Sequence, residues 1–420
     1  MPLKAAYARL TGADANIAPE EPKNGLLHVA ALTLTKVADS LIDPKLVLAW
    51  LLTSLGAPGM IIGALVPVRE AGALLPQLLL ARRVEAAPRT KIIWATSAAL
   101  QGLAALAIAT SVVLLEGAAA GWAVLAALAV LAAARAGASV SYKDVLARTI
   151  PTGRRGSITG FAAASGSLAA FAFGLAMALG LLPLARATLA AAVAAAGLAF
   201  LTASLLFRQL EEPKAEEGAA PMDLAALIAP LTDDRQLQRF IIARALLTVT
   251  ALAPPFIIML AGTARENSLA ALGPLVMAST AASVMAAYVW GRLSDRSSRN
   301  TLVAAGLLSA VALAVIALIG LSDASLGGRW GAAAAIFAAQ IAYEGVRQGR
   351  KLHLTDMTTD SQRARYTALS NSLIGTALLI GGGAGFVADR IGPAPLLLAF
   401  AAMALVGALV AVRLTDVQQD

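Results

Sequence analysis

The sequence lacks cysteine and has only two histidines among its 420 residues. Without cysteine the chain has no disulfide bond and no thiolate chemistry. His28 and His353 are too few and too far apart along the chain to predict a metal site. Only 14% of the residues are charged and 5% are aromatic, whereas a soluble protein usually carries about 25% charged residues. This scarcity of charge excludes an ordinary soluble domain.

Signatures of catalysis and nucleotide binding are also missing. No Walker sequence is present, and no nucleophile and base stand out as a catalytic constellation. The glycines of Gly381-Gly-Gly-Ala-Gly385 lie inside an apolar run, where they predict close helix packing rather than a phosphate loop. The sequence therefore predicts neither an enzyme nor an ATP-driven pump, and it implies no cofactor and no metal.

Long apolar runs are what the chain has instead. Hydrophobic residues make up 59% of it, in runs of about 20, the length that a helix needs to cross about 30 Å of hydrocarbon. The pattern predicts an all-α integral membrane protein with many spans. The twelve predicted spans are 26–52, 59–81, 92–115, 122–146, 155–181, 184–206, 237–261, 268–290, 300–321, 329–350, 364–388 and 392–414.

A polar, proline-interrupted linker at 207–236 divides the spans into two sets of six. The predicted organisation is an N-terminal segment 1–25, a six-helix bundle 26–206, the linker 207–236, a second six-helix bundle 237–414 and a tail 415–420. The N-terminal segment, the linker and the tail are expected in the cytoplasm.

The placement of basic residues predicts this orientation. The loops after spans 2, 4, 8 and 10 hold Arg82, Arg83, Arg89, Lys91, Lys143, Arg148, Arg154, Arg155, Arg292, Arg296, Arg299, Arg347, Arg350, Lys351, Arg363 and Arg365. The loops on the other side hold only Arg186, Arg265, Arg329 and Arg390. Because cytoplasmic loops are enriched in Lys and Arg, both termini are predicted to be cytoplasmic, in a plasma or inner membrane. The net charge of +8 therefore does not indicate nucleic-acid binding.

One short stretch between spans 8 and 9 has a recognisable pattern. Gly291-Arg-Leu-Ser-Asp-Arg-Ser-Ser-Arg299 predicts a tight loop at the membrane surface. Gly291 is expected to let two helices approach closely, and Asp295 to meet the positive end of the next helix. Arg296 and Arg299 favour the cytoplasmic side.

This stretch resembles the loop signature G-x-L-x-D-R-x-x-R of the major facilitator superfamily of secondary transporters. The resemblance covers residues 26–414, mostly as architecture. It implies two six-helix halves, solute bound near the membrane midplane, transport by alternating access, a monomer and a gating loop at 291–299. The first-half counterpart, Arg82 to Lys91, is basic but has neither the glycine nor the aspartate.

Sparse identities suggest that the halves are repeats. A shift of 208 residues aligns Lys143 with Lys351, Arg155 with Arg363, Thr159 with Thr367 and Lys36 with Arg244.

Ionisable residues inside the spans are the strongest functional indicators, because each costs roughly 2.5–3.5 kcal/mol on insertion scales. Lys36, Asp39 and Asp43 lie on one stripe of span 1, and the resemblance implies that this span lines the central cavity. Lys36 and Asp39 are able to pair along the helix. The alternative is a structural Lys36–Asp39 pair, with Asp43 and Lys45 flanking a wetted helix break at Pro44.

Span 2 carries Arg69 and Glu70, which point about 100° apart, so that one of them is expected to meet Asp39 or Asp43 across the helix interface. A locking ion pair and a contact with an anionic solute are equally compatible with this position. Arg69 suits an anion because guanidinium binds carboxylate or phosphate in a bidentate manner.

Spans 4, 7 and 10 provide further polar residues. Arg135, Ser139 and Tyr142 share one face of span 4, and Gln340, Tyr343, Glu344 and Arg347 stand at a matching depth in span 10. Span 7 has Arg244, which either lines the cavity or extends to the membrane surface, followed by Pro254-Pro255, which predicts a helix break.

These residues predict a secondary transporter for a small anionic or zwitterionic organic solute, coupled to protons. The candidate solute ligands are Lys36, Arg69, Arg135, Ser139, Arg244 and Tyr343. The candidate proton-coupling carboxylates are Asp39, Glu70 and Glu344. Two alternatives remain: a proton-coupled exporter of drugs or amphipathic compounds, and a non-transporting assembly factor or sensor with the same fold.

Overall fold

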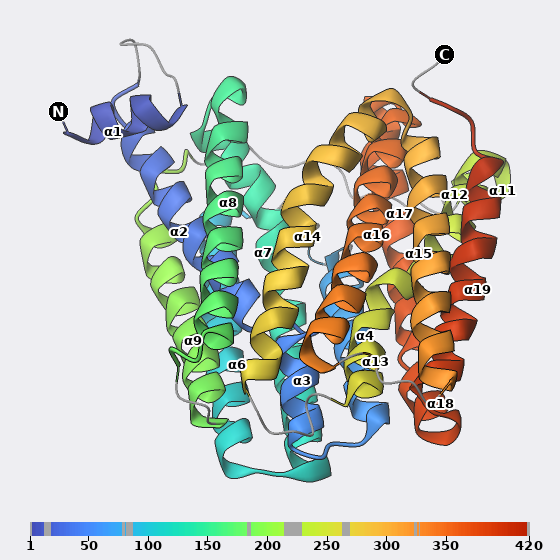
Figure 1. The fold of residues 1–420 in the computed structure, drawn as a ribbon. Helices are drawn as coiled ribbons and strands as arrows, with labels where there is room; N and C mark the ends of the chain where they lie inside the picture. The colour runs from blue at the N-terminus through green and yellow to red at the C-terminus, as the bar shows by residue number, and fades with distance from the viewer. Residues whose placement is uncertain are drawn as a thin grey trace.

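The computed structural model describes residues 2–11, 18–77, 80, 87–182, 186–213, 229–262, 269–322, 326 and 328–417, which form helices and their connections without a strand. Figure 1 shows two groups of helices side by side, with both termini at the same end of the molecule. We call the groups the N-terminal group (α1–α9) and the C-terminal group (α11–α19). The end that carries the termini is the terminal end, and the other is the opposite end.

The N-terminal group consists of α1 (Pro2–Thr11), α2 (Glu21–Leu41), α3 (Val47–Ser54), α4 (Gly59–Leu74), α6 (Thr90–Leu114), α7 (Gly117–Thr149), α8 (Thr152–Ala178) and α9 (Arg186–Arg208). The C-terminal group consists of α11 (Pro230–Asp233), α12 (Arg235–Leu246), α13 (Val249–Ala261), α14 (Leu269–Arg296), α15 (Ser298–Leu321), α16 (Gly328–Asp356), α17 (Asp360–Gly381), α18 (Ala384–Ile391) and α19 (Pro393–Val412).

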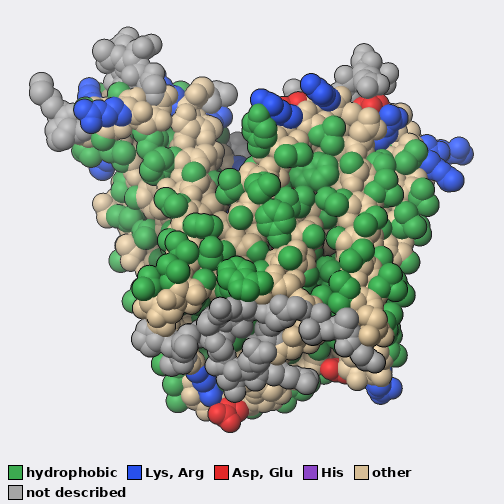
Figure 2. All heavy atoms as spheres, viewed as in Figure 1, with side chains coloured by type: hydrophobic (Ala, Val, Ile, Leu, Met, Phe, Trp, Pro, Cys, Tyr) green, Lys and Arg blue, Asp and Glu red, His purple; other side chains and the backbone are tan. Residues whose placement is uncertain are grey.

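Nine helices in the described part of the chain are long and apolar enough to cross a membrane, judged by length and composition. Large apolar side chains such as Leu168, Ile380 and Leu409 are exposed on the outside, and Figure 2 shows hydrophobic side chains spread over the visible flank. Such a surface suits lipid rather than water. Each predicted span overlaps one or two of the helices, and the count of twelve membrane crossings stays a prediction.

The two groups use the same packing pattern. In the N-terminal group α6 packs on α9 and α7, while α2 packs on α8 and α9. In the C-terminal group α15 packs on α19 and α16, while α12 packs on α17 and α19. The corresponding helices occupy the same order along the two predicted bundles. This correspondence supports the internal repeat that the sequence suggests only weakly.

The repeat extends to the segments that follow the last helix of each group. Glu212, after α9, accepts hydrogen bonds from the backbone N–H groups of Thr90 and Lys91 at 3.0 Å each, at the start of α6. Asp416, after α19, accepts a 2.9 Å bond from Ser297, the N-cap residue of α15. In both groups a carboxylate stabilises the positive N-terminus of a neighbouring helix.

We expect Glu212→Ala to lower the free energy of unfolding by about 3 kcal/mol, because it leaves buried backbone donors without an acceptor. The side chain of Glu212 is fully buried, and its Oε1 also accepts a bond from the Thr90 hydroxyl at 2.7 Å. Thermal unfolding in detergent measures the effect. Glu211→Ala is the matched control, since the half-exposed Glu211–Lys23 pair should contribute less than about 1 kcal/mol. Equal effects of the two substitutions would contradict the capping role.

Helix α1 is fixed to the terminal end by a buried tyrosine. The Tyr7 hydroxyl donates a 2.6 Å bond to Glu21 of α2, and Glu21 also pairs with Arg154 of α8. Burial, reinforced by the bond to Glu21, raises the pKa of the Tyr7 phenol above its usual value. Helix α1, which precedes the first predicted span, therefore packs as part of the N-terminal group.

The stretch at 291–299 differs from its prediction as a loop. Gly291 to Arg296 belong to α14, and Ser297 alone separates α14 from α15. A Cβ built on Gly291 has nothing within 4 Å, so this glycine does not serve close packing. Ser297, not Asp295, caps the next helix, because its side chain accepts a bond from the Asn300 N–H. Helix α14 extends beyond its apolar part and includes the polar residues up to Arg296. The turn between α14 and α15 therefore lies at Ser297 rather than at 291–299 as a whole.

The expected helix break at Pro254-Pro255 is also displaced. Both prolines lie inside α13, and the interruption falls at 247–248, between α12 and α13. Proline removes the hydrogen bond to the carbonyl four residues earlier. The carbonyls concerned belong to Thr250 and Ala251, in the first turn of α13, so the break lies on their N-terminal side.

At the opposite end the two groups touch through glycines. A Cβ on Gly63 of α4 would lie 2.6 Å from Gly385 Cα of α18, and a Cβ on Gly273 of α14 would lie 2.4 Å from the backbone nitrogen of Ala178 at the end of α8. Asp389 of α18 accepts bonds from Gly59 N (3.0 Å) and Met60 N (2.7 Å), the first residues of α4. These contacts, which we call the seam, close the space between the groups at this end.

Candidate functional site

A cavity of about 510 Å³ lies between the two groups. Its walls come from α2, the α2–α3 connection, α4, α7 and α8 on one side and from α13, α14 and α16 on the other. Figure 2 shows the surface hollowed between the two groups at the terminal end. The seam holds the groups together at the opposite end, and the hollow in Figure 2 places the opening between them at the terminal end.

The lining combines many polar and charged side chains with apolar ones. Its ionisable groups are Lys36, Asp39, Asp43, Lys45, Arg69, Glu70 and Arg135 from the N-terminal group, with Glu344, Arg347 and Arg350 from the C-terminal group. Its hydroxyl and amide groups include Ser40, Ser167, Ser279, Thr280, Ser283, Gln340 and Tyr343. The cations outnumber the carboxylates by six to four.

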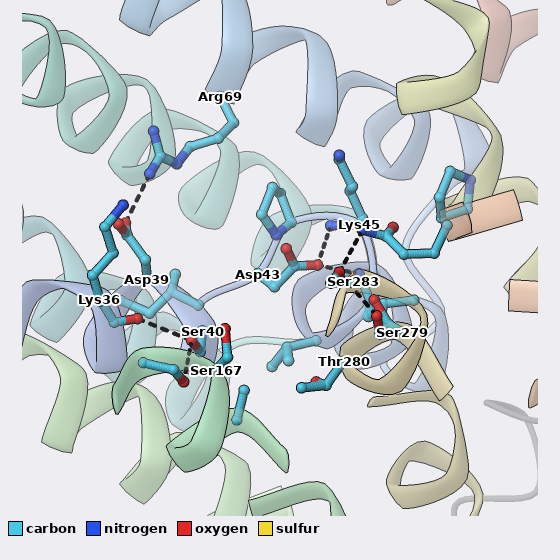
Figure 3. Close-up of a pocket in the computed structure, with 18 of the residues that line it drawn as sticks. Lys36, Asp39, Ser40, Asp43, Lys45, Arg69, Ser167, Ser279, Thr280 and Ser283 are labelled. Carbon is cyan, nitrogen blue, oxygen red and sulfur yellow. Dashed lines mark hydrogen bonds and ion pairs between the residues drawn. The ribbon is translucent and has the colours of Figure 1, made fainter. Parts of the chain in front are cut away.

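Asp39 is the centre of the N-terminal wall. Both of its carboxylate oxygens accept bonds from Arg135 of α7 at 2.5 Å, and Oδ1 also accepts a 3.0 Å bond from Arg69 of α4. The prediction that Arg69 or Glu70 meets Asp39 or Asp43 is confirmed for the Arg69–Asp39 pair, visible in Figure 3. The pair expected along the helix, Lys36 with Asp39, is replaced by these contacts between helices, since two guanidinium groups occupy the carboxylate.

The interruption between α2 and α3 places a second pair of residues. Asp43 Oδ1 accepts bonds from the backbone N–H groups of Lys45 (2.9 Å) and Leu46 (2.8 Å), and thereby fixes the turn at Pro44. The turn directs Lys45 into the cavity, where its ammonium lies 3.3 Å from the ring centroid of Tyr343. Lys45 is only 8% exposed. It is therefore a buried cavity cation, not a flank of a wetted break.

The C-terminal wall has its own carboxylate cluster, built around Glu344. Arg347 Nε donates to Glu344 Oε2 at 2.9 Å, one turn along α16. Oε1 of Glu344 accepts bonds from Gln340 (3.0 Å) and from Ser283 of α14 (3.3 Å). Glu344 is thus paired with a cation and bonded to two neutral groups.

Four charged groups of the lining lack such partners. Among the described residues, no carboxylate lies within ion-pair distance of Lys36, Lys45 or Arg350, and no cation lies within that distance of Glu70. Among the described lining residues, three cations and one carboxylate are thus without a direct ion-pair partner of the kind found at Asp39 and Glu344.

Two predicted ligands lie outside the cavity. Arg244 donates to Ser370 (2.6 Å) and Asn371 (2.9 Å) of α17 and is 8% exposed. Its position near the break after Leu246 turns it towards α17. Ser139 is an exposed residue of α7 and is not part of the lining. Because neither residue lines the cavity, the structure does not support their prediction as solute ligands.

The other predicted site residues are together in one place. The cavity lining contains Lys36, Arg69, Arg135, Tyr343, Asp39, Glu70 and Glu344. Their roles in solute binding and proton coupling stay predictions. Sequence reasoning missed Lys45 and Arg350 as lining residues, although the neighbouring Pro44 marks the turn that directs Lys45 inward. Arg350 was counted with the loop charges because it stands at the end of its predicted span.

The predicted gating residues lie away from the cavity. Arg299 pairs with Asp416 at 3.2 Å, which ties the α14–α15 junction to the segment after α19. Asp295 and Arg296 are exposed at the end of α14. A gating role for Gly291, Asp295, Arg296 and Arg299 stays a prediction. No group of histidine, aspartate and glutamate suited to a metal ion occurs in the described part of the chain.

No protein-family model matches the chain, and no curated protein matches it significantly in sequence. Solved structures resemble it over nearly its whole length. The D323A mutant of the nucleoside transporter NupG has a TM-score of 0.68 at 12% identity, covering 93% of this chain and 99% of the other. A D-xylose-proton symporter has a TM-score of 0.68 at 11% identity, covering 95% and 99%. A POT family transporter in complex with a thioalcohol-conjugated peptide has a TM-score of 0.67 at 10% identity, covering 92% and 95%.

These likenesses, together with the apolar helices, show that the chain has the major facilitator fold and is a multi-pass integral membrane protein. The expected all-α membrane fold is confirmed by these comparisons, while its division into twelve spans in two halves of six stays a prediction. At such low identity the fold does not transfer a substrate.

Proposed function

We propose that the protein is a secondary transporter that moves a small anionic or zwitterionic organic solute by alternating access. The observation that carries this proposal is the charge of the cavity. No carboxylate of a described residue lies within ion-pair distance of Lys36, Lys45 or Arg350, while Asp39 and Glu344 are already neutralised by arginines. Unpaired cations inside a membrane protein are costly, and an anionic group of a solute would offset that cost.

The dimensions and composition of the cavity support a small solute. A volume of about 510 Å³ falls in the range of roughly 300–1,000 Å³ that is usual for small-molecule sites. Hydroxyl groups from both walls, such as Ser167 and Ser283 (Figure 3), offer hydrogen bonds to polar parts of the solute. The free carboxylate of Glu70 suits an ammonium group, which is why a zwitterion fits as well as a simple anion.

Proton coupling is the second part of the proposal. Asp39 joins α2 to both α4 and α7 through two guanidinium groups. A carboxylate that is paired in one conformation and released to take up a proton in the other couples proton movement to the motion of the two groups. Glu70 and Glu344 are the further candidates, because both line the same cavity.

Orientation completes the proposal. If Lys and Arg mark the cytoplasmic side, the terminal end is cytoplasmic and the structure is open towards the cytoplasm. The proposed location is a plasma or inner membrane, with both termini in the cytoplasm and the protein acting as a monomer.

The alternative functions receive less support. An exporter of drugs or amphipathic compounds would favour a cavity lined by aromatic and methionine side chains, whereas this lining is charged and hydroxylated. A non-transporting sensor would favour a sealed cavity with every charge paired internally, whereas this cavity is open at the terminal end and contains unpaired charges.

A thermal-shift screen in detergent tests the proposal. The panel holds organic acids, amino acids, phosphate esters, sugars and cationic drugs. A compound that binds only the folded protein stabilises it by about 2.7 kcal/mol at a hundredfold excess over Kd. We expect stabilisation by one class of anion or zwitterion, lost in a triple variant that neutralises the unpaired cations (Lys36→Gln, Lys45→Gln and Arg350→Gln) and retained in the Ser139→Ala control. Stabilisation by cationic drugs alone would contradict the anionic class and favour the exporter.

A further inference from the structure

The contact between Lys45 and Tyr343 joins the two groups of helices inside the cavity. Lys45 belongs to the α2–α3 connection of the N-terminal group, and Tyr343 belongs to α16 of the C-terminal group. Figure 3 labels Lys45 together with Ser279 and Ser283 of α14, which line the same cavity. Both residues are buried, at 8% exposure each.

The buried ammonium of Lys45 has an aromatic ring as its partner but no carboxylate of a described residue in direct contact. An ammonium over an aromatic face is attracted by the ring quadrupole alone, whereas a carboxylate forms a charge-assisted hydrogen bond with it. No carboxylate of a described residue lies within ion-pair distance of Lys45, and its backbone rather than its ammonium is bonded to Asp43. Lys45 is the most buried of the three unpaired cavity cations.

We propose that Lys45 is the residue that binds the anionic group of the solute, and that Tyr343 holds Lys45 only while the cavity is empty. The anionic group of the solute then replaces the ring of Tyr343 as the partner of the Lys45 ammonium. This breaks a contact between the N-terminal and C-terminal groups of helices. Binding is thereby coupled to the movement of one group against the other. This inference rests on the proposed function and adds the ligand residue and the contact that the solute displaces.

The two other unpaired cations are less suited to this role. Lys36 is an exposed side chain on α2, where water solvates its charge before any solute arrives. Arg350 is partly exposed at the terminal end of α16. An anion gains most at a cation that is shielded from solvent and has no carboxylate in direct contact, because Coulomb attraction is strongest where screening is weakest. Lys45 is the least exposed of the three cations, and no carboxylate of a described residue lies within ion-pair distance of it.

Substitutions at the two residues should change affinity in opposite directions. Lys45→Gln removes the charge that binds the solute, so we expect about 100-fold weaker binding of the anion. Tyr343→Leu removes the competing contact, so we expect about threefold to tenfold tighter binding. Tyr343→Phe keeps the aromatic face and should bind the anion within about twofold of the wild type. A Tyr343 that contacted the solute directly would instead lose affinity in Tyr343→Leu.

The experiment is calorimetric titration of the wild-type protein and the three variants with succinate and with inorganic phosphate, using succinamide as the uncharged match. The predicted result is binding of at least one anion, no binding of succinamide and the opposite shifts in Lys45→Gln and Tyr343→Leu. Unchanged affinity in Lys45→Gln, or weaker binding in Tyr343→Leu, overturns the proposal. Binding and transport of only neutral or cationic compounds overturns it together with the proposed function.

A ligand-free measurement keeps the two proposals separable. The chain has no native cysteine, so spin labels can be attached only at Leu114→Cys of α6 and Ile391→Cys of α18, two exposed positions at the opposite end. We expect Tyr343→Leu to broaden the distance distribution between the labels towards longer values, and Tyr343→Phe to leave it unchanged. If no compound of any class binds, the proposed function fails, while this measurement still decides whether the contact holds the groups together. An unchanged distribution in Tyr343→Leu overturns the contact as a link between them.

Discussion

Replacing Asp39 by alanine should lower the free energy of unfolding by about 3 kcal/mol or more, because it leaves two arginines unpaired inside the membrane region. Arg135 contacts both carboxylate oxygens of Asp39 and Arg69 contacts one of them. The Asp39 side chain is 19% exposed and that of Arg69 is 12% exposed, so that water replaces little of the lost interaction. Thermal unfolding in detergent measures the loss.

Two comparisons isolate the electrostatic part of this effect. Glu116→Ala removes the partner of Arg186 in a pair whose carboxylate is 80% exposed, and it should cost less than about 1 kcal/mol. The double variant Asp39→Asn with Arg135→Gln should unfold at a higher temperature than the single variant Asp39→Asn. The reason is that Asp39→Asn leaves Arg69 and Arg135 without a carboxylate, and the second substitution removes one of these two charges. A double variant as unstable as the sum of its two single variants would contradict the buried charge cluster.

The same residue tests proton coupling. Asp39→Asn preserves size but cannot exchange a proton, so we expect uptake of the solute by proteoliposomes to lose its dependence on a pH gradient. Exchange of solute down its own gradient should persist if the variant is folded. Full pH-driven uptake in Asp39→Asn would remove Asp39 from the coupling scheme and leave Glu70 and Glu344 as the remaining candidates.

Enlarging Gly385 should force the seam open. A Cβ at this position would lie 2.4 Å from the carbonyl oxygen of Gly59, a backbone atom that cannot rotate away. We expect Gly385→Leu to raise the rate at which a membrane-impermeant maleimide, added on the side of the opposite end, labels Ser167→Cys by at least about tenfold. Ser167 lines the cavity, and the chain has no other cysteine that would react.

Gly160→Leu is the control for this substitution. A Cβ on Gly160 of α8 has nothing within 4 Å, so labelling should stay at the wild-type rate. Equal labelling of all variants from the opposite end would show that the seam does not limit access to the cavity. Loss of labelling from the terminal end in Gly385→Leu would in turn support movement of one group against the other rather than local damage.

Much of the architecture could be predicted because it follows from the length of apolar runs. A run of about 20 apolar residues has few structural options in a bilayer, and each predicted span therefore overlaps a helix of the structure. Helix ends were harder to predict. At 291–299 the polar residues that suggested a loop are the last turns of α14, because a helix does not need to end where its apolar part ends.

The cavity was partly predictable for a related reason. Lys36, Asp39, Arg69 and Glu344 are conspicuous as charges within apolar runs, and all of them line the cavity. Which charges pair could not be read from spacing along one helix, since Asp39 pairs with two other helices rather than with Lys36. Lys45 was missed because its position depends on the turn that Asp43 fixes, a feature of the folded chain.

Arg244 illustrates the limit of arguing from the repeat. The 208-residue shift aligns it with Lys36, which lines the cavity, yet Arg244 bonds to Ser370 and Asn371 of α17. The backbone pattern of the two groups is repeated, whereas the side chains around each position differ. Equivalent positions therefore share a place in the fold without sharing a role.

The most direct test of the account is counterflow in proteoliposomes. Vesicles are preloaded with the anion that stabilises the protein most in the thermal-shift screen, and the same compound is added outside at a trace, radiolabelled level. We predict transient accumulation of label by the wild type and by the Ser139→Ala control, and none by folded Lys45→Gln. Folded wild-type protein that exchanges only neutral or cationic solutes, or none at all, would contradict the assignment as a transporter of anions.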